Sequence, residues 1–82
     1  MGIQNQVSSS FGAVLRELRE AAGMTQETLG FESELRRTFI SVLELGHQQP
    51  SLTTIFKLAA ALNISASEMV RLVEEHKTLR KP

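Results

Sequence analysis

Apolar residues in this chain recur at helical spacing in short segments, and each segment ends at a residue that suits a helix terminus. No stretch alternates apolar and polar residues over the length of a strand. Gly23, Gly46 and Asn63 are suited to the left-handed conformation that ends many helices. The pattern therefore predicts five helices with short connections, which is a compact all-α domain.

Hydroxyl side chains mark the expected helix starts, because a hydroxyl there accepts a hydrogen bond from an otherwise unpaired N–H. The candidate caps are Ser9 or Ser10, Thr25, Ser51 and Ser65. Ser65 and Glu68 form a capping-box pattern, and the fifth helix is expected to reach Thr78 or Leu79. Spacing assigns the following residues of the fourth and fifth helices to the core: Leu52, Ile55, Phe56, Ala59, Leu62, Met69, Val70 and Val73.

The chain is short enough to form one domain. Residues 1–8 show no apolar period, and we expect a disordered N-terminal segment there. Residues 9–70 form the expected domain. Residues 71–82 are expected to extend the fifth helix as a dimerisation surface or a tail.

Composition excludes several classes of function. The chain has no cysteine, and its two histidines lie far apart, so we expect no metal site. It has no Ser/His/acid set, no paired catalytic carboxylates and no cofactor signature, so we expect no enzyme, no cofactor and no small-molecule ligand. Residues 1–10 lack the pattern of a signal peptide and no apolar run is long enough to span a bilayer, so we expect a cytoplasmic protein without membrane contact.

The charges balance overall but are unevenly distributed. Nine Lys and Arg residues face nine Glu residues, for a formal net charge of zero. Residues 11–34 carry a net charge of −3, whereas residues 35–67 carry +2. Any contact with nucleic acid must therefore come from a local basic patch rather than from the whole domain.

Two short predicted helices, residues 26–33 and 37–45, are separated by very few residues, as in a helix-turn-helix. The surrounding sequence resembles the Cro/C1-type, or XRE-type, helix-turn-helix family over about residues 11–70. Its stand-alone members, such as phage repressors and restriction–modification controller proteins, are the most similar in size. The matching residues are Leu15-Arg16-Glu17-Leu18-Arg19, Gly23-Met24-Thr25-Gln26-Glu27, Leu29, Ile40-Ser41, Leu43-Glu44, Gly46, Pro50-Ser51, Thr54, Leu58-Ala59, Leu62, Ser65 and Glu68.

The resemblance implies a five-helix lambda-repressor-like domain that binds double-stranded DNA in a sequence-specific manner and regulates transcription. It implies that Gln26 contacts a phosphate and that residues 37–45 form the recognition helix. The implied DNA contacts are Thr25, Gln26, Arg36, Arg37, Thr38, Phe39, Ser41, Val42, His47 and Gln48. Phe39 equally suits a core position. The alternative for Thr25 is a simple cap and for Gln26 a polar first residue of the helix, and the alternative for the loop after Gly46 is a solvated loop.

The resemblance also implies a homodimer on a palindromic operator, with two recognition helices one DNA turn apart. The residues expected at the dimer interface are Leu62, Ile64, Leu72, His76 and Leu79. The alternative for this stripe is a broad core-facing surface within one chain. Arg19 and Glu44 stand where relatives form a structural salt bridge.

The sequence departs from the family pattern at the turn. Glu34 stands where glycine is usual, and Arg36 stands where a capping Ser, Thr or Asp is usual. Glu34 is therefore expected to adopt a positive φ, at a cost of about 1 kcal/mol or more. This turn and the neutral net charge leave a second hypothesis open, in which the chain is a protein-interaction module, antitoxin-like or a complex subunit, that kept the fold.

Overall fold

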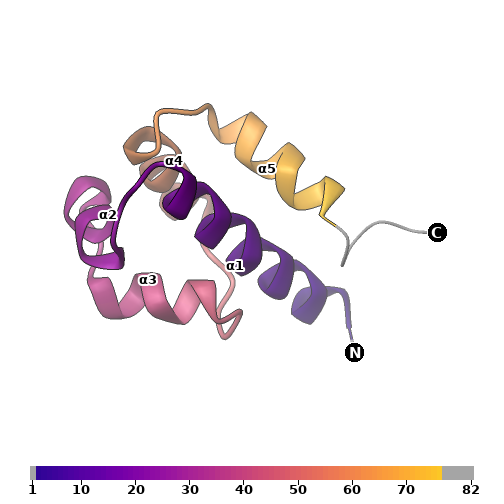
Figure 1. Cartoon of the computed structure of the whole chain (residues 1–82). Coiled ribbons are helices and arrows are strands. Elements are labelled where there is room, and N and C mark those ends of the chain that lie inside the picture. Colours follow the sequence, from indigo (N-terminus) through magenta and orange to yellow (C-terminus); the bar gives the residue numbers. More distant parts are fainter. Residues whose placement is uncertain (1, 77–82) are drawn as a thin grey trace.

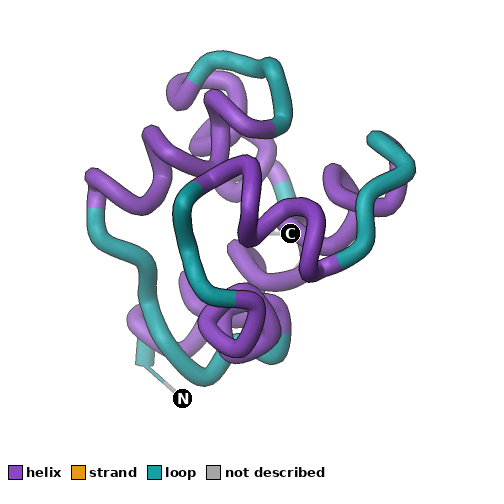
Figure 2. Tube along the Cα trace, turned by 90° about the vertical axis from the view of Figure 1, so that its left-hand side faces the viewer, coloured by secondary structure: helices purple, strands orange, loops and turns teal. Residues whose placement is uncertain are grey.

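The computed structural model describes residues 2–76, and this range contains five α-helices and no strand (Figure 1). The helices are α1 (Ile3–Ala21), α2 (Gln26–Ser33), α3 (Arg37–Glu44), α4 (Leu52–Ala61) and α5 (Ala66–Glu75). α1 packs against both α3 and α5, while α2 packs against α3 and α4. Figure 2 shows short loops joining helices that cross in different directions. The all-α prediction is confirmed.

The core draws side chains from all five helices. The largest fully buried apolar side chains are Leu15 of α1, Leu29 of α2, Ile40 and Leu43 of α3, Leu58 of α4 and Met69 of α5. Because no single pair of helices encloses this cluster, each helix depends on the others to remove its apolar face from water.

The N-terminal helix begins earlier than the serine pattern predicts. α1 starts at Ile3 with Gly2 as its cap, so the expectations of a cap at Ser9 or Ser10 and of disorder up to residue 8 are corrected. Ile3, Val7 and Phe11 are four residues apart, and Phe11 is buried. These apolar residues extend the helix toward the N-terminus.

The serines of α1 serve packing rather than capping. Ser8 and Ser10 are buried within the helix, and the Ser10 hydroxyl has no hydrogen-bond partner. The backbone of Ser9 lies so close to Gly46 that a Cβ on the glycine would be 3.1 Å from the Ser9 Cα. Small side chains on α1 therefore allow the end of the α3 region to approach closely.

The prediction of one apolar stripe on α4 is wrong in part. Leu52 and Phe56 are 67% and 59% exposed, whereas Leu58, Ala59 and Leu62 are buried. On α5, Val70 is 46% exposed, while Met69 and Val73 are buried as expected. α4 carries apolar residues on two faces, and spacing alone does not show which face the rest of the chain covers.

The predicted turn residues are confirmed. Gly23, Gly46 and Asn63 all adopt positive φ angles, of 72°, 76° and 61°. Each places the chain in the left-handed region that ends a helix. The connections are therefore short because these residues reverse the chain within a few positions.

Only half of the expected capping box forms. The Glu68 N–H donates to Ser65 Oγ at 3.0 Å, but the Glu68 carboxylate pairs with Arg71 at 2.6 Å. The hydrogen bond from Arg71 lowers the pKa of the Glu68 carboxyl. α5 ends at Glu75, and the expected continuation to Thr78 or Leu79 lies outside the described residues.

Residues 2–76 contain neither a helix that could span a membrane nor a cluster of metal-binding side chains. None of these helices is both long and apolar enough to cross a bilayer. The same residues contain no cluster of His, Cys, Asp or Glu side chains that could hold a metal ion.

Candidate nucleic-acid interface

A tight turn joins α2 to α3. Glu34 adopts φ 61° and ψ 37°, the left-handed conformation expected at this position. The Leu35 N–H donates to the Gly30 carbonyl oxygen at 2.8 Å, which closes the end of α2. A Cβ on Gly30 would be only 2.8 Å from the Leu35 oxygen. Gly30 is therefore the position in this turn that requires glycine, because the backbone of residues 35–37 passes directly over it. Glu34 adopts the left-handed backbone angle instead.

α3 has one buried face and one open face. Ile40 and Leu43 are completely buried, which fixes how the helix is rotated on the core. Arg37 and Thr38 are exposed on its outer side, and Arg36 is exposed just before it. The Arg36 side chain makes no capping hydrogen bond, as expected for a residue that has no acceptor. α3 and the residue before it thus present two guanidinium groups and a hydroxyl to solvent.

Gly12 of α1 sets the distance between α1 and α3. A Cβ at this position would overlap the Leu43 carbonyl oxygen and would lie 2.7 Å from the Glu44 oxygen. Real side chains do not tolerate such contacts with backbone atoms. Gly12 therefore lets the C-terminal end of α3 lie directly against α1.

A partly buried ion pair connects α1 to the end of α3. Arg19 Nε donates to Glu44 Oε2 at 2.6 Å, and Arg19 Nη2 donates to Glu44 Oε1 at 3.0 Å. This bidentate geometry is the strong form of the pair. The hydrogen bond to Glu44 raises the pKa of Arg19. Arg19 Nη1 also donates to the Met24 carbonyl oxygen at 2.8 Å, so the same side chain holds the turn before α2.

Gln26 joins this network from the start of α2. Its Nε2 donates to Glu44 Oε1 at 3.0 Å. Thr25 caps the helix, since its hydroxyl oxygen accepts from the Thr28 N–H at 3.0 Å. The first turn of α2 and the last residue of α3 are therefore tied together, and Arg19 lies behind them.

The structure places the predicted DNA-contact residues on α2, on α3, at the cap residue before α2 and in the two segments that follow these helices in the chain. The exposed members are Thr25, Arg36, Arg37, Thr38, His47 and Gln48. Gln26, Phe39, Ser41 and Val42 are half-buried. Phe39 packs against the core cluster, as its alternative interpretation expected. α2 and α3 lie together at one end of the molecule, away from α5 (Figure 1).

Sequence reasoning missed one exposed residue at this end. Leu45 directly follows α3 and is exposed. It is seven residues after Thr38, which places it on the same side of the helix. The spacing of seven residues between Thr38 and Leu45 is visible in the sequence. There, Leu45 marks only the end of the predicted helix.

Comparison with known proteins agrees with this geometry. A family model described as helix-turn-helix matches residues 15–69, which include α2, the turn and α3. The chain belongs to the Cro/C1-type helix-turn-helix family. It is therefore a transcriptional regulator of helix-turn-helix type, in a family of DNA-binding proteins.

Within this family the chain is similar to restriction–modification controller proteins. Control protein C.BamHI of Bacillus amyloliquefaciens is 36% identical over 67 residues, covering 80% of this chain and 83% of the relative. The structure of controller protein C.AhdI from Aeromonas hydrophila is 47% identical, with a TM-score of 0.73 over 76% of this chain and 94% of that one. A C.Esp1396I nucleoprotein complex matches with 26% identity and a TM-score of 0.79, over 93% and 96% of the two chains.

The predicted dimer residues of this family member differ in accessibility. Leu62 is buried in the core, and Ile64 and Leu72 are half-buried and pack against it. His76 is half-buried at the end of α5, and Leu79 lies outside the described residues. A dimer through these residues remains a prediction, with Leu62 offering little surface to a second chain.

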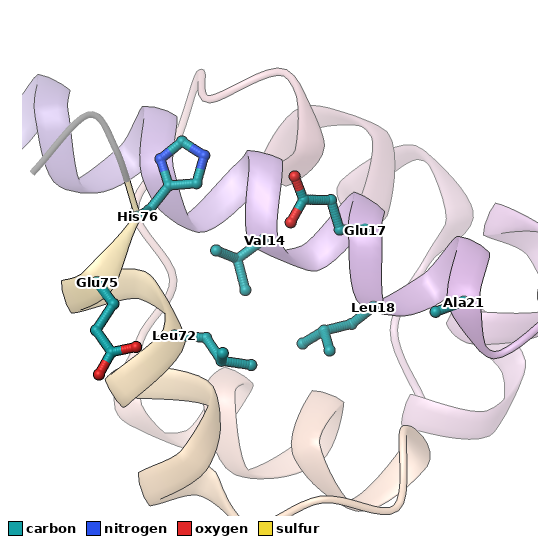
Figure 3. Close-up of a pocket in the computed structure, with 7 residues that line it drawn as sticks. All are labelled: Val14, Glu17, Leu18, Ala21, Leu72, Glu75 and His76. Atoms are coloured by element: carbon teal, nitrogen blue, oxygen red, sulfur yellow. The ribbon is translucent and has the colours of Figure 1, made fainter.

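A hollow of about 410 Å³ lies between α1 and α5 (Figure 3). Leu18 of α1 and Leu72 of α5 line it from opposite sides, and Val14 lies between them and His76. Glu17 of α1 and Glu75 of α5 also line it. Leu72 is therefore directed toward α1 of its own chain.

Proposed function

We propose that this regulator binds a palindromic DNA operator as a homodimer and reads base edges with the outer face of α3. One observation supports this most directly. The inner face of α3 is fully buried at Ile40 and Leu43, while Arg37 and Thr38 on its other side have no cover. The packing thus leaves the face with base-reading side chains open.

The dimensions suit the major groove. An α-helix with its side chains is about 10–12 Å across, which fits the width of the groove, and the eight residues of α3 give it an axial length of about 12 Å. An arginine on such a helix can donate two hydrogen bonds to guanine O6 and N7. Thr38 and Ser41 can bond bases or phosphates, and Val42 can contact a thymine methyl group. The first turn of α2 and the polar loop at His47 and Gln48 would then lie over the phosphate backbone.

A second copy of the chain would supply the contacts to the other half of the palindromic DNA site. One helix of this length spans only a few base pairs, and two such helices must lie about 34 Å apart to read one face of the duplex. Each protomer measures 36 × 22 × 21 Å, so two copies side by side can reach this separation.

We propose that the copies meet through an α4–α5 apolar face, defined as Leu52, Phe56 and Val70. All three are exposed within residues 2–76. Val70 also lines a small apolar groove together with Ile55 of α4 and with Val7 and Phe11 of α1. Exposed apolar side chains on two helices that pack together are typical of protein interfaces. This face is more accessible than the predicted Leu72 stripe, whose Leu72 is directed toward α1.

The decisive experiment is Arg37→Ala, tested on an operator selected from a random duplex library. We expect affinity for the selected site to fall by about 5- to 150-fold, the range for a lost bidentate base contact, while the fold is retained. Fluorescence anisotropy measures the affinity, and circular dichroism checks the helices. Arg16→Ala is the matched control, because Arg16 is an exposed arginine of α1 whose side chain pairs with Glu20. Equal affinities for the two variants would refute the role of Arg37.

The zero net charge supports the alternative hypothesis, in which the chain is a protein-interaction module that kept the fold. It predicts no measurable binding to duplex DNA at low salt. The regulator hypothesis predicts that the protein binds unselected DNA. The affinity should fall steeply as the salt concentration rises, because phosphate contacts release counterions. A salt titration with random duplex therefore separates the two.

A further inference from the structure

Leu45 is an exposed leucine at the C-terminal end of α3. It is 65% exposed within residues 2–76, and it is not part of the core cluster of these residues. A single exposed leucine is common on protein surfaces and indicates nothing by itself. The position of this leucine on α3, and the way its backbone is held, distinguish it from the others.

Leu45 lies in line with Thr38 and Ser41 on the outer face of α3. Its backbone is still helical, with φ −79° and ψ −5°, and its N–H donates to the Ser41 carbonyl oxygen at 3.0 Å. Residues three, four and seven positions apart share one face of a helix, so these three follow one another along α3. Ile40 and Leu43 are buried on the other side. Leu45 therefore belongs to the face that is proposed to enter the groove.

The backbone on both sides of Leu45 is fixed by α1. The Glu44 carboxylate, just before it, accepts two hydrogen bonds from Arg19. Gly46, just after it, lies against the backbone of Ser9, where a Cβ on the glycine would be 3.1 Å from the Ser9 Cα. The direction in which the Leu45 side chain leaves the helix is therefore set before DNA binds, which lowers the entropy cost of a contact made by this side chain.

The side chains at this end of α3 restrict what it can recognise. Among residues 41–46 only Glu44 is charged, and its side chain is 4% exposed and paired with Arg19. Leucine has no group that donates or accepts a hydrogen bond. The apolar group that base pairs present in the major groove is the C5-methyl group of thymine. A leucine directed at base edges therefore favours thymine.

α3 is short enough for both ends of its outer face to lie over bases. Thr38 and Leu45 are seven residues apart, which is about 10 Å along the helix axis. Successive base pairs are about 3.4 Å apart, so this distance corresponds to about three base pairs. Arg37 and Thr38 at one end and Leu45 at the other would then contact different base pairs of one half-site.

We propose that Leu45 is a specificity-determining residue, which packs on the C5-methyl group of one thymine in each half of the operator. This rests on the proposed function and adds the identity of one base that α3 selects. The outer face of α3 then has a hydrogen-bonding end at Arg37 and Thr38 and an apolar end at Leu45.

Replacing thymine by uracil in the operator tests this contact, because uracil pairs in the same way and lacks only the methyl group. The operator is the site selected from a random duplex library by the wild-type protein, and fluorescence anisotropy measures affinity. We expect uracil at one position of each half-site to lower affinity by about 4-fold per methyl group, the factor for one buried CH₂ group. Leu45→Ala should bind the thymine and uracil duplexes equally at that position. Leu45→Met, which keeps a long apolar side chain, should retain the preference for thymine.

Ile3→Ala is the matched control for Leu45→Ala. Ile3 of α1 is also 65% exposed, and its replacement by alanine removes the same number of carbon atoms. The uracil effect should keep its wild-type size in Ile3→Ala. Because Leu45 is exposed, Leu45→Ala should retain the circular dichroism spectrum of the wild-type protein. The uracil scan of the wild-type protein is itself a test that needs no variant.

The possible failures are distinguishable. If the wild-type protein tolerates uracil at every position, or if Leu45→Ala keeps the wild-type uracil effect, the inference is wrong. If this occurs while Arg37→Ala still lowers affinity for the selected site, the regulator stands without a base contact from Leu45. If the wild-type protein binds no duplex at any salt concentration, the proposed function itself fails.

Discussion

At the scale of single residues, the turn between α2 and α3 shows how this chain accommodates an unfavourable side chain. Glu34 adopts a left-handed backbone conformation that costs a non-glycine residue about 1–2 kcal/mol. Burial of Leu29 on one side of the turn and of Ile40 on the other holds the backbone in this conformation. The sequence departs from the family pattern here, but the turn itself forms.

We therefore predict that Glu34→Gly stabilises the domain by about 1 kcal/mol, because glycine adopts this conformation without strain. For a domain of this size, the melting temperature should rise by about 4–8 °C. Thermal denaturation followed by circular dichroism measures the change. Glu32→Gly is the control, since Glu32 is an exposed helical residue where glycine should destabilise. A fall in melting temperature for both variants would contradict this account.

At the scale of elements, the contact between α1 and α3 depends on the absence of a side chain at Gly12. Glycine inside a helix usually weakens it by about 0.5–1 kcal/mol relative to alanine. Here a Cβ would overlap backbone oxygens at the end of α3. Close packing of the two helices therefore outweighs helix propensity, and it also brings Glu44 within reach of Arg19.

Gly12→Ala is therefore expected to destabilise the domain, although replacing a glycine inside a helix by alanine usually stabilises it. We predict a loss of about 1–3 kcal/mol, as for overpacking in a core, and a lower melting temperature. Urea denaturation measures this free energy. Ser9→Ala in the same helix adds no atom and should be nearly neutral. If Gly12→Ala raised stability, α3 would not lie as close to α1 as the structure places it.

At the scale of the whole molecule, the exposed apolar residues are unevenly placed. Leu52 and Phe56 are exposed one turn apart on α4 and Val70 is exposed on α5, which packs against it, whereas Phe31 is exposed on α2, at the proposed DNA-binding end. Exposed apolar side chains are common one at a time, but a cluster on adjoining helices marks an interaction surface.

For this reason we predict that Phe56→Glu produces a monomer, while Phe31→Glu leaves the oligomeric state unchanged. Both changes introduce a charge at an exposed phenylalanine, so general effects on solubility cancel. Sedimentation velocity gives the mass in solution. A dimer that persists in Phe56→Glu but disappears in Leu72→Glu, with both variants folded, would place the interface on the stripe predicted from the sequence.

The sequence by itself determined the helices and most of their ends. Apolar spacing, together with Gly23, Gly46, Asn63 and three hydroxyl caps, fixes α2 to α5 within a few residues, because these signals act on the local backbone. The family pattern supplied the Arg19–Glu44 pair, which the structure contains, and assigned Arg37 to an outer face that is exposed.

Only the tertiary structure decided which apolar residues are covered. Spacing placed Phe56 inside the core and left the first residues disordered, yet Phe56 is exposed and Val7 lies within a helix. The hydrogen bond between Gln26 and Glu44 was also invisible in the sequence. Both depend on how helices distant in the chain pack on one another, and a periodic pattern within one helix carries no information about its neighbours.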